Sequence, residues 1–388
     1  MTQKLLLIGG GHSHAIALNL WAKQPLPDVE VTLISPQQLT PYSGMLPGLV
    51  AGHYTLAQTH IHLPALCRKA NARFIEDCVT GIDTQAQNVV TASGQTLAYD
   101  RVSINCGITP ATAVPGAAQF AIGVKPIAEF YPRWQSLLKQ LEARQGSTPF
   151  QLLVVGGGAA GVELILAMHH YLTRSQPQHL SQQPVEFTLI QSGKGLPEGY
   201  PQRLQHKVQQ TFADKGIRVL TDSRVTRVEQ DQVIINGTKA QQAIAGDAVF
   251  WCTQAGAADW PQASGLITDK QGFIRVNQHL QSLNATNVFA CGDIASQESF
   301  STPKAGVFAV RQGPLLFHNL HASLQGKPLQ SFQPQAAYLS LLAAGDRYGW
   351  GCRIGQGLFP TLSGHWVWRW KDRIDRRFMA QFPNGNGI

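Results

Sequence analysis

The feature that most constrains the fold is a pattern that occurs twice: a short apolar run, a cluster of glycines, and a stretch that can form a helix. The first copy spans residues 4–15 and the second spans residues 151–163. A buried parallel strand that ends in a glycine turn and a helix presents unpaired backbone N–H groups and a positive helix end to a pyrophosphate. Because the two copies lie about 150 residues apart, the sequence predicts a chain that holds two dinucleotides.

The two glycine turns differ at one position. The second is a complete Gly-x-Gly-x-x-Gly that ends at Gly161, whereas the first has His14 where the third glycine is expected. In the first turn we expect Gly9 to make the tight turn and Gly11 to let the backbone approach the ligand. We expect His14 to lie beside the ligand or under the helix, where a glycine would otherwise pack.

After each turn and its helix comes a second apolar strand, which completes a right-handed βαβ unit. An acidic residue near the end of such a strand usually binds a ribose hydroxyl. Here the first strand ends in Ser35-Pro36 and the second in Gln191-Ser-Gly-Lys194, without an acid. Lys194 either tolerates a 2′-phosphate or is a solvated surface lysine. The sequence therefore does not decide whether the second dinucleotide carries a 2′-phosphate.

A third element is an apolar strand that leads to Gly292 and Asp293. In a two-nucleotide chain this arrangement suits an Asp293 carboxylate that accepts hydrogen bonds from polyol hydroxyls, such as those of a flavin ribityl chain. About ten residues later, Thr302 as N-cap and Pro303 at the first helical position predict a helix. We expect its positive end to face the pyrimidine side of a flavin and to stabilise the negative charge that develops there on reduction. Lys304 either adds to this field or faces solvent.

The segment 39–54 contains two prolines and three glycines among apolar side chains. Rigid, irregular segments of this kind often line cofactor pockets. The alternative is a tightly packed surface loop.

Composition narrows the class of protein. Only 14% of the 388 residues are charged and 37 are glycine, which favours a compact α/β protein with many turns. The net charge is +8, but the basic residues form no long run and no aromatic–basic motif, so we expect no nucleic-acid partner. The six cysteines show no Cys-x-x-Cys and no zinc spacing, which indicates a reduced, cytoplasmic protein without a metal site. No apolar run approaches the ~18 residues of a membrane span.

The stretch 366–379 predicts an amphipathic helix. Trp366, Trp370, Ile374 and Phe378 recur every four residues, and arginines border them. Such a helix suits a bilayer interface, which would make the protein peripheral on the inner membrane face. Docking onto the rest of the chain, or onto the second copy of a homodimer, is the competing interpretation.

These motifs carry a resemblance to a known superfamily. Over residues 1–325 the chain resembles the two-dinucleotide-binding-domain flavoproteins, the pyridine nucleotide–disulfide oxidoreductase superfamily. Its segment 40–47 looks like the flavin-side loop of type II NADH dehydrogenases and sulfide:quinone oxidoreductases. Four segments also resemble the flavoprotein module found fused to selenide, water dikinase, namely 11–14, 41–53, 303–313 and 366–378.

The resemblance implies an α/β fold with two Rossmann-like dinucleotide-binding domains, the second inserted in the first, plus a C-terminal α+β segment. Residues 1–118 and 248–325 would form the FAD-binding domain, 119–247 the NAD(P)-binding domain, and 326–388 a C-terminal interface or membrane-association segment. It implies FAD on the first unit, NAD(P)H on the second, and hydride transfer to flavin N5. Glu163 matches a helix glutamate that lies near the nicotinamide in relatives, and packing at the domain interface is the alternative role.

The candidate site residues follow from the motifs and the resemblance together. Those expected at FAD are Gly9, Gly11, His12, His14, Ser35, Pro36, Tyr42, Ser43, Gly44, Met45, Val79, Cys106, Gly107, Gly292, Asp293, Lys304 and Ala305. Those expected at NAD(P)H are Gly156, Gly158, Ala159, Ala160, Gly161, Glu163 and Gly256. Lys304 and Glu163 are the two expected to act in catalysis.

The electron acceptor stays open. The helix after the first turn has no redox cysteine pair, which argues against disulfide reduction. Type II NADH dehydrogenases carry an Ala-Gln-x-Ala-x-Gln signature near the quinone, and the matching stretch here keeps only Gln312. A small-molecule acceptor, either a quinone or a selenium or sulfur species, is expected. One alternative is a flavoprotein acting on reduced selenium or sulfur, with Cys106 or Cys291 as the chalcogen site. Another is a non-enzymatic flavin- or nucleotide-sensing module that recruits a partner.

Overall fold

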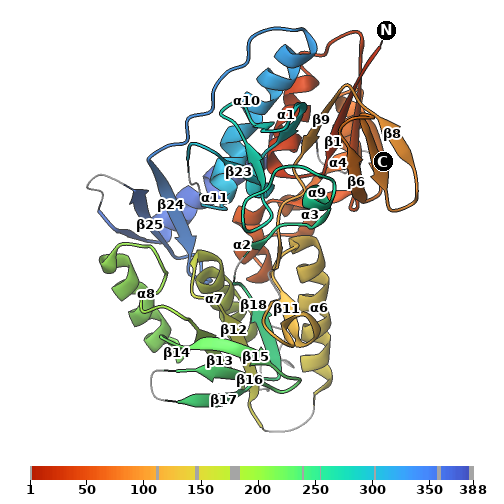
Figure 1. Ribbon diagram of the computed structural model, residues 1–388. Coiled ribbons are helices and arrows are strands. Elements are labelled where there is room, and N and C mark those ends of the chain that lie inside the picture. The colour runs from red at the N-terminus through yellow and green to blue at the C-terminus, as the bar shows by residue number, and fades with distance from the viewer. Residues whose placement is uncertain are drawn as a thin grey trace.

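The computed structural model describes residues 2–110, 113–144, 148–174, 184–237, 240–253, 255–300, 303–355 and 360–383. Two lobes are stacked one above the other, and a C-terminal segment packs beside their junction (Figure 1). The first lobe is built on a mixed sheet that is mainly parallel, and the second on a parallel sheet. Thr302, the expected N-cap, lies outside the described residues.

The first lobe contains an eight-stranded sheet in the order β23-β20-β21-β22-β9-β1-β2-β5. Its strands are β1 (Gln3–Ile8), β2 (Val29–Ser35), β5 (Arg73–Glu76), β9 (Arg101–Ile104), β20 (Ile274–Val276), β21 (Gln281–Ser282), β22 (Ala285–Ala290) and β23 (Ala295–Gln297). Strand β1 pairs in parallel with β2 and with β9. Its residues 5–8 are at most 3% exposed, because a parallel strand covered on both faces needs a continuous apolar run. Helices α1 (His12–Trp21) and α10 (Gly306–Leu324) lie side by side (Figure 1).

The second lobe contains a five-stranded parallel sheet in the order β11-β18-β12-β13-β14. These strands are β11 (Ala121–Gly123), β12 (Phe150–Val155), β13 (Val185–Ile190), β14 (Arg218–Leu220) and β18 (Ala248–Trp251). Its helices are α5 (Ala117–Phe120), α6 (Ile127–Ala143), α7 (Ala159–Arg174) and α8 (Gln202–Asp214), and an antiparallel sheet of β15 (Arg224–Val228), β16 (Gln232–Asn236) and β17 (Gln241–Ala245) completes the lobe.

Shorter elements complete the first lobe and join the two lobes. They are β3 (Leu39–Pro41), the 3-10 turn η1 (Ser43–Met45), α2 (Leu46–Val50), α3 (Leu56–Thr59), β4 (His60–His62), α4 (Leu63–Lys69), β6 (Val79–Asp83), β7 (Asn88–Thr91), β8 (Thr96–Ala98), α9 (Trp260–Ala263) and η3 (Gly292–Ile294). The strands β10 (Thr109–Pro110) and β19 (Ala255–Gly256) pair with each other where the chain passes between the lobes.

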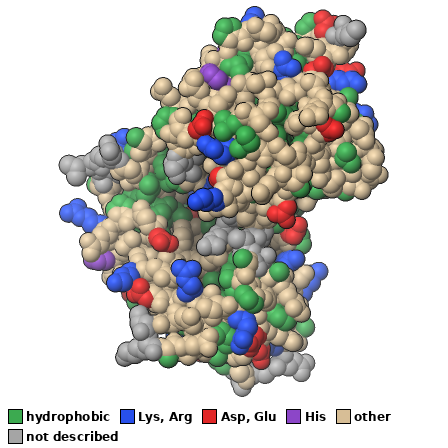
Figure 2. Space-filling view, in the orientation of Figure 1, with side chains coloured by type: hydrophobic (Ala, Val, Ile, Leu, Met, Phe, Trp, Pro, Cys, Tyr) green, Lys and Arg blue, Asp and Glu red, His purple; other side chains and the backbone are tan. Residues whose placement is uncertain are grey.

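The C-terminal segment is a small antiparallel sheet followed by one helix. It consists of β24 (Ala337–Ala343), β25 (Gly349–Gly355), β26 (Leu362–Gly364) and α11 (His365–Met379). Strand β24 contacts α7 of the second lobe, and α11 contacts α3 of the first. Hydrophobic side chains gather over β24 and β25 on the face shown in Figure 2. Among the described residues, no helix is long and apolar enough to cross a membrane.

The α/β fold expected from the sequence is confirmed, and two of its details are corrected. Strand β18 (Ala248–Trp251) pairs with β11 and β12 in the second sheet, so a first-domain boundary at residue 248 is placed one strand too early. The helix expected to start at Pro303 begins at Gly306 instead, with Ala305 in extended backbone at its N-cap. Both differences arise from pairing and packing that a local sequence pattern does not reveal.

Candidate active site

A cavity opens at the carboxyl ends of the parallel strands in the first lobe. This is the edge where open α/β sheets bind their ligands. The cavity is lined by ten of the residues expected at FAD, namely Gly9, Gly11, His12, Ser35, Pro36, Ser43, Val79, Cys106, Gly107 and Asp293. The structure therefore brings the ends of β1, β2, β9 and β22 to one site.

The first glycine turn fits tightly against the end of β9. Gly9 has a φ of +90°, and a Cβ there would lie 2.5 Å from the carbonyl oxygen of Asn105. A Cβ on Gly11 would lie 2.4 Å from the side-chain amide of Asn105. Only glycine fits these two positions. The turn can thus present its backbone closely to a phosphate group at the N-terminus of α1.

His14 lies under this turn and outside the cavity. It is 0% exposed, and burial lowers its pKa to about 4, so the ring is neutral near pH 7. Its Nδ1–H donates to the Gly9 carbonyl at 2.7 Å, which leaves Nε2 to accept from the Ser103 hydroxyl at 2.8 Å. His14 therefore holds the shape of the turn from below, which is the second of the two positions expected for it.

His12, in contrast, lines the cavity and also carries a polar atom without a partner in the described part of the chain. Its Nε2 is buried and has no hydrogen-bond partner among the described residues. Burial lowers the pKa of His12 to about 4, and its ring packs edge-on against Tyr42 at 5.4 Å between centroids. A buried polar atom without a partner is costly, and nothing among the described residues offsets that cost at His12 Nε2.

Asp293 meets a lysine that sequence reasoning missed. The Lys125 ammonium lies 2.9 Å from the Asp293 carboxylate, and both residues line the cavity. Gly292 has a φ of +68° and donates its N–H to the buried Gln312 side chain at 2.6 Å. Gln312 therefore holds the turn that carries Asp293. No local signal marks Lys125, because it lies 168 residues from its partner.

Lys304 and Ala305 do not line this cavity; their neighbour Gly306 does. The Lys304 ammonium donates to the Ala295 carbonyl at 2.7 Å and lies 3.8 Å from the centroid of the Phe273 ring. Burial lowers its pKa to about 8. The lysine is turned toward β23 because α10 starts later than expected, and the N-terminus of α10 itself faces the cavity through Gly306.

Of the loop 42–45, only Ser43 lines the cavity. Tyr42 stacks on Phe378 of α11 with 4.5 Å between centroids, and Met45 is buried. The Gly44 carbonyl accepts a hydrogen bond from the Lys371 ammonium. The C-terminal helix therefore supports the loop from the side opposite the cavity.

Lys371 belongs to a buried polar cluster on α11. Its ammonium forms an ion pair with Asp375 at 2.7 Å, and the two side chains are only 13% and 6% exposed. The Asp375 carboxylate also lies near the Tyr42 hydroxyl and, after burial, contributes to the raised pKa of that tyrosine. This cluster connects the C-terminal helix to the loop that borders the cavity.

The second glycine turn has the complete pattern and the matching geometry. Gly156 has a φ of +116°, and a Cβ on Gly161 would lie 1.9 Å from the Gly156 carbonyl oxygen. Around Gly158 a Cβ would meet nothing within 4 Å, which leaves room for a ligand. Ala159 and Ala160 form the first turn of α7. Gly256 lies apart from this turn, in the β10–β19 pair.

Glu163 faces the C-terminal segment. One of its carboxylate oxygens accepts the Ala343 N–H of β24 at 2.7 Å. Burial raises its pKa to about 7, and the nearby Lys371 ammonium opposes this rise. The residue therefore sits where α7, β24 and α11 meet, close to the polar cluster.

The cysteines do not form a redox pair in the described residues. All six are free, and Cys291 is 0% exposed. Burial raises the pKa of both Cys252 and Cys291 to about 12, so these thiols are not thiolate nucleophiles near pH 7. Cys78 and Cys106 are exposed and line the cavity. Among the described residues, no three His, Cys, Asp or Glu side chains are grouped so that they could hold a metal ion.

The fold and site together define a class: an oxidoreductase with two dinucleotide-binding domains, whose first glycine turn and Asp293 border one cavity. Comparison with known proteins gives the family. The profile described as pyridine nucleotide-disulphide oxidoreductase matches residues 3–313, and the chain belongs to this family. It is accordingly an FAD-dependent oxidoreductase that uses NAD(P)H, as the resemblance implied.

Individual relatives agree with the family. NADH dehydrogenase-like protein YutJ of Bacillus subtilis is 25% identical over 356 residues, 90% of this chain and 92% of YutJ. Demethylphylloquinone reductase NdbB of Synechocystis sp. is 28% identical over 275 residues, 68% of this chain and 65% of NdbB. The chain thus spans just under two thirds of the latter relative.

Solved structures show the same fold. The sulfide:quinone oxidoreductase from Aquifex aeolicus superposes with a TM-score of 0.80 at 20% identity, over 98% of this chain and 92% of that chain. NDH2 from Plasmodium falciparum in complex with NADH gives a TM-score of 0.80 at 16% identity, over 98% of each chain.

Proposed function

We propose that this protein oxidises NAD(P)H through FAD and passes the electrons to a quinone at a membrane surface. One observation supports a quinone as the acceptor. Helix α11 contacts the loop 42–45 beside the cavity on one side and exposes apolar side chains on the other. Its inner side holds Gly44 through Lys371. Its outer side exposes Trp366, Trp370 and Ile374 by 51%, 37% and 43%.

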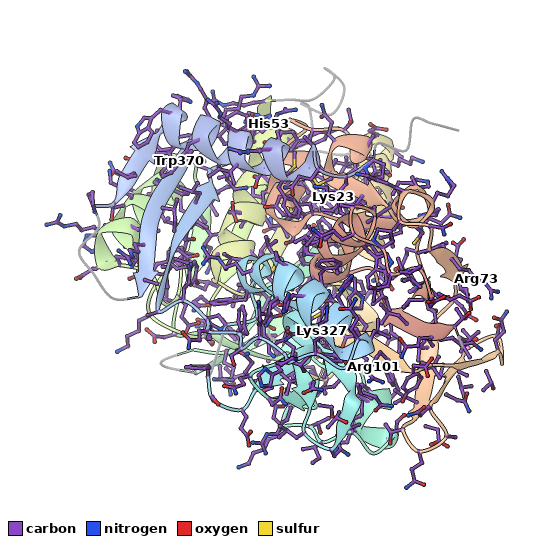
Figure 3. The ribbon with its side chains drawn as sticks, turned by 90° about the horizontal axis from the view of Figure 1, so that it is seen from above. Lys23, His53, Arg73, Arg101, Lys327 and Trp370 are labelled. Carbon is purple, nitrogen blue, oxygen red and sulfur yellow. The ribbon has the colours of Figure 1, made fainter. Side chains whose placement is uncertain are left out.

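The outer side of α11 has the chemistry of a membrane-surface helix. The Trp366 and Trp370 rings are stacked in parallel 6.4 Å apart, and Figure 3 places Trp370 on this helix at the edge of the molecule. Arg369 and Arg373 are exposed beside them. Tryptophans with flanking arginines suit the lipid interface, where rings enter the acyl boundary and cations meet anionic headgroups. A quinone dissolved in lipid would then lie close to the helix that supports the flavin loop.

The residues of the first site fit FAD. The glycine turn would bind the pyrophosphate, Asp293 would accept the ribityl hydroxyls, and the N-terminus of α10 at Gly306 would face the pyrimidine ring with its positive end. FAD, when bound, accepts a hydride from NAD(P)H and returns electrons to an acceptor.

Names of relatives also support a quinone acceptor. The relatives include a demethylphylloquinone reductase and a sulfide-quinone reductase. These names belong to those proteins, and they make a quinone the acceptor to test first.

A second candidate function is a reaction with sulfur or selenium species. It is favoured by Cys106, an exposed residue that lines the cavity, although burial of the thiol raises its pKa to about 12, so the thiol is largely protonated near pH 7. Cys291 does not suit this role, because it is buried and its pKa is raised to about 12.

Reoxidation of the reduced enzyme separates the two functions. The FAD-loaded protein is reduced anaerobically with NADH and mixed in separate runs with a short-chain quinone, polysulfide or selenite, with and without vesicles of anionic phospholipid. We expect the quinone to reoxidise the flavin fastest, and vesicles to speed the reaction of a lipid-soluble quinone. Reoxidation only by polysulfide or selenite, and its loss in Cys106→Ser, would contradict the quinone proposal.

A further inference from the structure

The end of β13 leaves one question about the second nucleotide site. Dinucleotide-binding domains usually discriminate NADH from NADPH with an acid at the end of the second strand, which binds the ribose 2′-hydroxyl. The residue after β13 is Gln191, an uncharged amide. The structure shows what surrounds this amide and which charge lies next to it.

Both ends of the Gln191 amide are occupied. Gln191 is 3% exposed. Its Oε1 accepts the Gly157 N–H of the second glycine turn at 2.7 Å, and its Nε2 donates to the carboxylate of Glu198 at 3.2 Å. Gln191 therefore ties the glycine turn to Glu198, and because it is buried it presents little of its own amide to a ribose hydroxyl.

Glu198 is held at the turn by its backbone as well. Its N–H donates to the Gly157 carbonyl at 3.1 Å. Leu196, two residues earlier, is 0% exposed and packs under Gly157. The Gln205 side chain of α8 donates to the Pro197 carbonyl at 3.0 Å. The loop after β13 is thus fixed on the glycine turn.

The second oxygen of this carboxylate lies at the strand exit. A Cβ added to Gly193 would lie 3.3 Å from Glu198 Oε1, and the Glu198 side chain as a whole is exposed. Lys194 is exposed too, and among the described residues it makes no hydrogen bond or ion pair. Near the end of β13, the Glu198 carboxylate is therefore fixed by hydrogen bonds, whereas the Lys194 ammonium has no such bond within the described ranges.

We propose that Glu198 replaces the missing strand-end acid and makes the protein select NADH over NADPH. A 2′-hydroxyl can donate a hydrogen bond to the carboxylate, whereas a 2′-phosphate would meet a like charge at close range, which is strongly unfavourable. The inference rests on the proposed use of a nicotinamide nucleotide at the second turn, and it adds the identity of that nucleotide.

Equilibrium binding to the FAD-loaded protein tests this inference without turnover. Isothermal titration calorimetry with ADP-ribose and with 2′-phospho-ADP-ribose gives the two dissociation constants at one fixed ionic strength. We expect the wild type to bind ADP-ribose at least about tenfold more tightly, which corresponds to ~1.4 kcal/mol. In Glu198→Gln, which keeps the size and removes the charge, the ratio should fall to within about threefold.

Two control variants locate the effect. Glu186→Gln removes the same charge from the opposite end of β13, where Glu186 accepts a hydrogen bond from Gln151 at 3.0 Å, and should keep the wild-type ratio. Lys194→Gln should keep or widen it.

Equal or tighter wild-type binding of 2′-phospho-ADP-ribose overturns the assignment of Glu198, as does an unchanged ratio in Glu198→Gln. If neither ligand binds, both this inference and the use of NAD(P)H at this turn are wrong. The first two outcomes leave the proposed NAD(P)H oxidation intact, so the two failures are distinguishable.

Discussion

The Lys371 ammonium of the C-terminal helix donates a hydrogen bond to the Gly44 carbonyl, on the loop whose next-door residue Ser43 lines the cofactor cavity. The two residues are 327 positions apart in the chain. This contact joins the C-terminal segment to the loop that borders the cavity, although none of its described residues lines the cavity.

Replacing Lys371 should therefore loosen the cofactor and destabilise the fold. Lys371→Met removes the bond to Gly44 and leaves the buried Asp375 carboxylate without its cation. Breaking a buried ion pair on one side typically costs about 3–5 kcal/mol. We expect a lower thermal midpoint and a lower FAD content in the purified protein. Arg373→Met, at an exposed position on the same helix, is the control and should change neither by much.

Asp293 should be needed for FAD affinity. Asp293→Asn removes the charge that pairs with Lys125 and weakens acceptance of hydrogen bonds from the ribityl hydroxyls. Losing a charged hydrogen-bond acceptor costs about 1.5–3 kcal/mol, or roughly tenfold or more in dissociation constant. Titration of apoprotein with FAD, followed by flavin fluorescence, measures this. An affinity equal to that of the wild type would remove Asp293 from the site.

Glu163 should make stability fall as pH rises. Its pKa is about 7 in the folded protein against 4.5 for the ordinary side chain, so between these values the folded state binds more protons than the unfolded state. The free energy of unfolding then decreases with pH across that window. The buried histidines His12 and His14, whose folded pKa is lowered to about 4, act in the opposite direction. The measurement is therefore a difference between wild type and Glu163→Gln.

In Glu163→Gln the amide oxygen can still accept the Ala343 N–H. Urea unfolding from pH 5 to pH 8 should show the variant gaining stability relative to the wild type as pH rises. A difference that stays constant with pH would show that Glu163 does not titrate in this window.

The exposed face of α11 should bind vesicles. Trp366→Ser with Trp370→Ser should abolish co-sedimentation with anionic phospholipid vesicles, and added salt should weaken wild-type binding because arginines contribute to it. Ile267→Ser, at a 40% exposed position in the first lobe, is the matched control. If the wild type does not bind vesicles but forms a dimer, and if Trp366→Ser with Trp370→Ser makes it monomeric, this face is a homodimer interface instead.

Much of the site was predictable where a residue is dictated by its own neighbours along the chain. Gly161 is required because a Cβ would lie 1.9 Å from the Gly156 carbonyl oxygen of the same turn, and Gly9 is favoured because its φ is +90°. Such local requirements appear in the sequence as a pattern. The side chains at the ends of β2, β9 and β22 meet because parallel strands end at one edge.

The remaining contacts depend on distant parts of the chain. Lys125 reaches Asp293 across 168 residues, and Lys371 reaches Gly44 across 327. Lys304 was expected nearer the flavin because the sequence places the helix start at Pro303. Instead α10 starts at Gly306, which packs so closely on Ser43 that an added Cβ would lie 3.1 Å from the serine Oγ.

The reductive half-reaction is the step on which the proposed function depends. The purified protein is loaded with FAD and titrated with NADH in the absence of oxygen while the visible absorbance of the flavin is recorded. We expect about one equivalent of NADH to remove this absorbance, since one hydride reduces one flavin. Bound FAD that neither NADH nor NADPH reduces would contradict the proposed function.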